Sequence, residues 1–126
     1  MPVPKKGSAS ATRIEYRSPD PATNPYLAFS VILAAGLKGV REGYELAPEA
    51  DANLFQMDDL ALQKMGVQQL PQSLNDALRI MEGSALVHEA LGEHIFDWFL
   101  RNKHREWRQY KTQVTPFELN NYLKSI

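Results

Sequence analysis

The chain has 126 residues, 44% apolar and 23% charged, so it is long enough for one ordinary globular core and too short for two well-sized domains. Its formal net charge of -1 excludes a bulk field that would draw the whole molecule onto nucleic acid or an anionic membrane. It has no cysteine, which excludes disulfides and thiolate metal sites and is compatible with the cytoplasmic location that we expect.

Residues 1–24 are predicted to form a stub, a strand and a proline-rich loop. Residues 1–10 are rich in Pro, Lys, Gly and Ser and offer little apolar surface to bury. The segment from Thr12 to Arg17 then alternates in character, as a strand does, with one charged face: Arg13, Glu15 and Arg17. Three prolines between Ser18 and Pro25 end this strand in an extended loop. Because no partner strand is predicted elsewhere, we expect the strand to belong to a sheet completed by residues outside this chain.

Residues 25–126 are predicted to be helical, and the first helix is the most apolar. Asn24 followed by Pro25 is typical of an N-cap with proline at the first helical position, and Gly43 is the expected end. Apolar side chains cover most of the circumference of this helix, so we expect it to be buried nearly all round. The apolar run from Tyr26 to Leu37 is shorter than the roughly 20 residues that a membrane-spanning helix needs, so no membrane association is expected.

Further helices are predicted from their capping residues. Asp58 to Met65 should form a short helix closed by Gly66, and Ser73 should cap the next one. A turn or two should begin at Ser84, followed after Gly92 by a long amphipathic helix. The last helix should start at the capping box Thr115-Pro116-Phe117-Glu118 and run to about Leu123. We therefore expect a mainly α domain in which about five helices pack on one another.

The charged face of the predicted strand is the strongest candidate for a functional site. Arg13 and Arg17 flank the carboxylate of Glu15. Arginine forks bind phosphate and carboxylate groups bidentately, and a carboxylate between them could ligate Mg²⁺ or Mn²⁺. From spacing alone, an exposed strand with a ladder of opposite charges is the commoner outcome. The residues by themselves leave both interpretations open.

Two other polar groups are weaker candidates. One suggests a metal site but lacks two histidines at i, i+4 spacing, so we interpret it as a solvated helix surface: His88, Glu89, Glu93 and His94. The other is basic and could bind nucleic acid or an acidic partner: Arg101, Lys103, Arg105, Arg108 and Lys111, beside Trp107 and Tyr110. Cations near a helix C-terminus also complement the macrodipole, which is the interpretation we favour, and nucleic-acid binding is not expected.

The string from Ser10 to Phe29, which holds the charged strand and the proline-rich loop, resembles the glutamine synthetase family. The resemblance covers residues 3–123, and its last motifs are similar to the subtype found in Gram-positive bacteria and some archaea. Its further motifs are Ala34-Ala35-Gly36-Leu37-Lys38-Gly39, Leu70-Pro71-Gln72-Ser73-Leu74, Ala90-Leu91-Gly92-Glu93-His94 and Thr112-Gln113-Val114-Thr115-Pro116. The fold that it implies is the helical C-terminal segment of an α+β catalytic domain.

The resemblance implies ATP-dependent ligation of ammonia to glutamate through γ-glutamyl phosphate, with Mg²⁺ or Mn²⁺. Glu15 matches a metal-ligating glutamate, and Arg13 matches an arginine on the ATP side. Arg17 matches a catalytic arginine that contacts substrate glutamate or the transferring phosphate. The family's other metal ligands lie upstream of this sequence, so we expect the isolated chain to be inactive and to bind none of these cofactors tightly.

The resemblance also bears on partners and control. It implies other glutamine synthetase subunits as partners, and uncovered surfaces predict self-association of this chain. The alternative is a stand-alone helical interaction or regulatory module derived from that enzyme, in which residues 1–17 would dock on the chain's own helices. Phe55 stands where many enteric-type members have an adenylylated tyrosine, so the resemblance implies that this control is missing.

Overall fold

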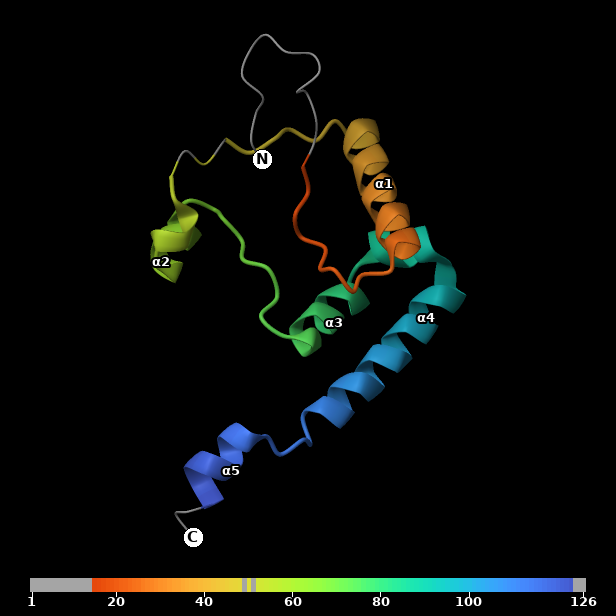
Figure 1. The fold of residues 1–126 in the computed structure, drawn as a ribbon. Helices are drawn as coiled ribbons and strands as arrows, with labels where there is room; N and C mark the ends of the chain where they lie inside the picture. The colour runs from red at the N-terminus through yellow and green to blue at the C-terminus, as the bar shows by residue number, and fades with distance from the viewer. Residues whose placement is uncertain (1–14, 49, 51, 124–126) are drawn as a thin grey trace. The chain divides into compact units, whose positions relative to one another are not determined.

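The computed structural model describes residues 15–48, 50 and 52–123, and the regular structure in these residues is helical (Figure 1). The chain divides into two compact units, residues 1–70 and 71–126, instead of the single core that we expected. Chain length limits how much core can form but does not say how the helices share it. The separate boundary predicted at residue 24 stays a prediction.

Helix α1 of the first unit spans Pro25–Glu42, as predicted. Asn24 Oδ1 accepts hydrogen bonds from the backbone N–H groups of Tyr26, at 3.0 Å, and Leu27, at 3.4 Å. Gly43 ends the helix with φ 65°, a left-handed conformation that glycine adopts at little cost. Local capping chemistry therefore accounts for both ends of α1.

The prediction that α1 is buried nearly all round is wrong for the described part of this chain. None of its residues is buried. Its large apolar side chains include several exposed ones: Tyr26, Phe29, Ile32, Leu33, Leu37 and Val40. The physical reason is that no other described element packs extensively against α1, so its apolar surface has no cover among those residues.

The rest of the first unit contains two short helical elements. Helix α2 spans Asp59–Lys64, as predicted, with Asp58 Oδ1 accepting a hydrogen bond from the N–H of Ala61 at 2.8 Å. Before it lies a single 3-10 turn, η2, at Leu54–Gln56, in a segment that was predicted to be a loop. Leu62 of α2 is the buried apolar residue described in this unit.

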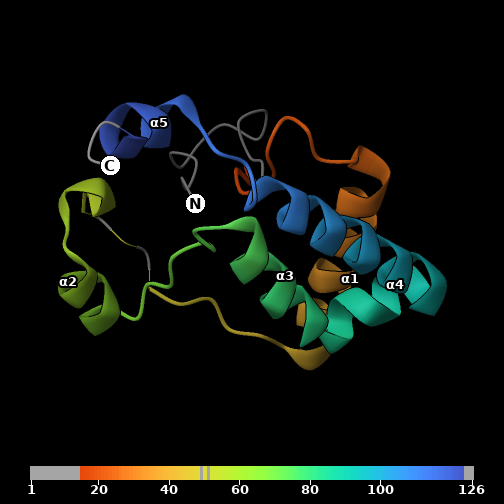
Figure 2. The same ribbon diagram turned by 90° about the horizontal axis from the view of Figure 1, so that it is seen from below.

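The second unit contains α3 (Leu74–Glu82), α4 (Ala85–Tyr110) and α5 (Pro116–Tyr122). Helices α3 and α4 lie side by side and form the one extensive contact between elements of the described residues (Figure 2). Leu78 of α3 and Phe96 of α4 are buried. The expectation of about five helices packed on one another is therefore corrected to one packed pair, because α1, α2 and α5 find no extensive contact in the described part.

Helix α4 changes direction at Gly92, where φ is 73° and ψ is 155° (Figure 1). This interruption was predicted, and it suits glycine because side chains disfavour positive φ. In a straight helix His88 and Phe96 would lie roughly 12 Å apart along the axis. Across the kink their rings meet edge to face, with centroids 4.8 Å apart at 76°.

Helix α5 begins at the predicted capping box. The backbone N–H and the hydroxyl of Thr115 both donate to Glu118 Oε2, at 2.7 and 3.1 Å. Among the described helices, none combines the length and the apolar character needed to cross a membrane.

Candidate functional site

Glu15 and Arg17 lie at the start of the described residues and contact one another. Arg17 Nε donates a hydrogen bond to Glu15 Oε1 at 2.6 Å, and Arg17 Nη2 forms an ion pair with the same oxygen. The side chains therefore share one side of the backbone, as their i, i+2 spacing predicted. The Arg17 side chain is 79% exposed and that of Glu15 34%. Ion pairs at exposed positions contribute about 0–1 kcal/mol to stability.

The third predicted site residue, Arg13, lies outside the described residues, as does half of the predicted strand, residues 12–14. Residues 15–17 have no regular secondary structure. The described part of the chain also holds no strand that could pair with them. Whether residues 12–17 form a strand in a larger sheet stays a prediction.

A short turn connects Arg17 to α1. Asp20 Oδ1 accepts a hydrogen bond from the N–H of Ala22 at 2.6 Å, and the Asp20 carbonyl accepts one from Thr23 at 3.1 Å. Prolines on both sides of Asp20 restrict the backbone further. The N-cap at Asn24 follows directly. Seven residues, 18–24, therefore lie between the charged pair and the start of α1, and hydrogen bonds within this segment hold its turn.

The described residues do not complete a metal site. They contain no group of three or more His, Asp or Glu side chains that could hold a metal ion. The carboxylate of Glu15 is a suitable oxygen ligand for Mg²⁺ or Mn²⁺, but a single protein ligand does not fix the geometry of such an ion. The weaker metal candidates on α4 are exposed, in keeping with a solvated surface: His88, Glu89, Glu93 and His94.

Phe55, the residue at the predicted adenylylation position, lies in η2 and is fully exposed, at 102%. The backbone N–H of Phe55 donates to Asn53 Oδ1 at 3.2 Å, which fixes the turn that presents the ring. The side chain is accessible but carries no hydroxyl.

One polar cluster was missed from the sequence. His104 of α4 lies with Nε2 2.6 Å from Glu82 Oε1 of α3. The two residues are 22 positions apart, so only the packing of α3 on α4 brings them together. The basic residues near His104 were noted, but no local sequence signal marked Glu82 as their neighbour.

Comparison with known proteins gives one consistent result. Residues 1–122 match the family described as "Glutamine synthetase, catalytic domain". The chain is 53% identical over 123 residues to the glutamine synthetase of Mycolicibacterium smegmatis, an alignment covering 98% of this chain and 28% of the relative. Identity is 44% over 117 residues to that of Methanosarcina mazei, covering 93% and 26%. It is 40% over 118 residues to that of Thermotoga maritima, covering 94% and 27%. The chain thus spans about a quarter of the length of these relatives.

Proposed function

Because this chain belongs to the glutamine synthetase family, in which it matches a C-terminal part of the catalytic domain, we propose that it supplies one part of a glutamine synthetase active site. The reaction of the longer enzyme is the ATP-dependent ligation of ammonia to glutamate. The observation that carries the proposal is the match over residues 1–122, which includes Glu15 and Arg17.

Arg17 is the proposed substrate-binding and catalytic residue. Its guanidinium group already holds a carboxylate, that of Glu15, through Nε and Nη2. The same fork can hold the carboxylate of glutamate or a transferring phosphate, and a fixed cation there favours the more highly charged transition state. The exposure of Arg17 leaves room for such a ligand.

Glu15 is proposed as one of several metal ligands, and Arg13 as a contact on the ATP side. The remaining ligands must come from protein outside the residues that the structure describes, because these hold no metal-binding cluster. Other glutamine synthetase subunits, and the rest of the catalytic domain, are the proposed partners. By itself the chain is proposed to be catalytically inactive.

A chimera tests this proposal. This chain would replace the matching 123 residues of the Mycolicibacterium smegmatis relative, with which it is 53% identical. We expect the chimera to release phosphate from ATP in a manner dependent on glutamate and ammonia, and the isolated chain to show no such activity. A chimera that assembles to the size of its parent but is inactive would contradict the proposal, as would turnover by the isolated chain.

A further inference from the structure

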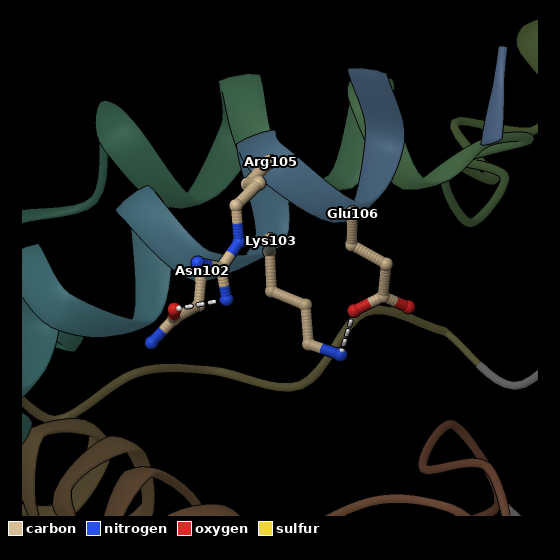
Figure 3. A network of polar contacts seen from close by, with 4 residues as sticks. All are labelled: Asn102, Lys103, Arg105 and Glu106. Carbon is tan, nitrogen blue, oxygen red and sulfur yellow. Dashed lines mark hydrogen bonds and ion pairs between the residues drawn. The ribbon is translucent and has the colours of Figure 1, made fainter. Parts of the chain in front are cut away.

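The cations in the C-terminal half of α4 differ in whether they have partners. Figure 3 shows two that do: Lys103 Nζ lies 2.6 Å from Glu106 Oε2, and Arg105 Nη2 donates to Asn102 Oδ1 at 3.4 Å. Arg101 and Arg108 are exposed, and neither guanidinium group forms an ion pair or hydrogen bond with another described residue.

Arg101 and Arg108 line one groove together with His104. The three follow i, i+3, i+7 spacing, which places them on one face of α4. The groove has a volume of about 380 Å³, within the usual range for small-molecule sites. Its other lining residues are Asp97 and Leu100 of α4 and Glu82 of α3. The contact between His104 and Glu82 ties the groove to the packed helix pair of this unit.

The helix macrodipole does not explain this arrangement. Its effect is confined to the last turn, which contains Arg108. Arg101 lies roughly two and a half turns before the end of α4. The macrodipole also has no preference for one face of the helix. The macrodipole therefore accounts for Arg108 but not for Arg101, nor for the position of both guanidinium groups beside His104 on one face.

We propose that this groove binds a small molecule carrying two anionic groups, phosphate or carboxylate. One anionic group is held by the fork of Arg101 and the other by the fork of Arg108, with His104 between them. The imidazole of His104 already lies beside one carboxylate, since its Nε2 is 2.6 Å from Glu82 Oε1. Asp97 opposes this binding, because it lines the groove one turn before Arg101 and forms no ion pair with it.

Isothermal titration calorimetry of the 126-residue chain at low ionic strength tests the proposal, with pyrophosphate and succinate as separate probes. We expect saturable binding that Arg101→Gln and Arg108→Gln each weaken about tenfold, the loss of one charge-assisted contact. Asp97→Asn should tighten binding several-fold. Arg105→Gln is the matched control, since it removes the same charge from the same helix outside the groove, and it should leave binding unchanged. All four positions are exposed, so circular dichroism should show unaltered helix content.

The two probes identify the ligand chemistry. Binding of pyrophosphate alone assigns the groove to phosphate groups, and binding of succinate alone assigns it to carboxylates. Shifts of the His104 ring protons in NMR spectra provide a second readout where the heat is small. Saturable binding by neither probe, in heat or in His104 shifts, would overturn the proposal. So would equal weakening by Arg105→Gln, which would indicate an unspecific response to net charge. Neither readout depends on glutamine formation.

Discussion

Thr115 and Glu118 form the capping box that begins α5. The hydrogen bond from the backbone N–H of Thr115, and then the one from its hydroxyl, hold the pKa of the Glu118 carboxyl below its ordinary value of 4.5. A carboxyl with a lowered pKa in the folded state stabilises that state above its unfolded pKa. This contribution disappears as the pH falls through the lower, folded value.

The lowered pKa of Glu118 in the folded state determines how the stability of α5 depends on pH. Acidification below pH 4.5 should loosen the first turn of α5, and the amide proton of Thr115 should shift along with the titration of Glu118. NMR spectra recorded between neutral pH and about pH 2, a range that spans carboxyl titration, measure both. Glu118→Gln can still accept the hydrogen bonds but cannot titrate, so it should abolish the shift. If the amide proton of Thr115 in Glu118→Gln still shifted with pH as it does in the original chain, the account would be contradicted.

The pair Glu15 and Arg17 was predictable from the sequence only in part. Alternation was enough to place Glu15 and Arg17 on one side, because that depends only on the two-residue period of extended backbone. It could not show that the two side chains would contact one another, since this depends on which neighbours are present. The contact of His104 with Glu82 could not be predicted either, because it requires the packing of two helices.

At the scale of the elements, helix boundaries were predictable and burial was not. Asn24 with Pro25, Ser73 and the Thr115 capping box each fixed a start, because an N-cap bonds to groups within three residues of itself. Burial depends on what covers a helix. The apolar surface of α1 predicted a buried position, and this prediction was wrong for the described residues, because they supply no element that packs extensively against α1.

The kink in α4 gives a test at this scale. Gly92→Ala should destabilise the second unit by about 1–3 kcal/mol, because the combination of φ 73° and ψ 155° is nearly restricted to glycine. It should also separate the rings of His88 and Phe96, which NMR can follow. Gly36→Ala is the contrasting variant: Gly36 lies within α1 with no atom near its added Cβ, so it should stabilise that helix by up to about 1 kcal/mol. Thermal melts in which Gly92→Ala raises stability would contradict the assigned role of the kink.

For the whole molecule, the exposed apolar face of α1 predicts self-association. Phe29 and Leu33 are 69% and 63% exposed and lie one turn apart. Light scattering should show the average mass rising with concentration, because contact between such faces removes apolar surface from water. The double variant Phe29→Lys with Leu33→Lys should lower this association. Val114→Lys, at a 68% exposed position in the second unit, should not. A monomer over the whole concentration range would count against the prediction.

Of the properties of the whole molecule, the family could be predicted from the sequence and the division into two units could not. The family was recognisable because the motifs are continuous runs of sequence, and residues 1–122 match it. The separation into two units could not be recognised in the sequence, because length and composition limit the size of a core but do not determine which helices form it. The comparisons give no support to the alternative of an independent interaction module.

The most direct test of the account is the steady-state turnover of the chimera carrying Glu15→Gln, measured as phosphate release dependent on glutamate, ammonia and a divalent metal. If Glu15 is a metal ligand of a glutamine synthetase active site, this nearly isosteric change should reduce turnover by about a hundredfold or more, equivalent to about 2.7 kcal/mol, and should weaken metal binding while thermal stability stays the same. Glu45→Gln, which removes an exposed carboxylate in the loop after α1, is the control and should keep full turnover. Near-normal turnover and metal affinity with Glu15→Gln would contradict the assignment of Glu15 and, with it, the proposed active-site role of this chain.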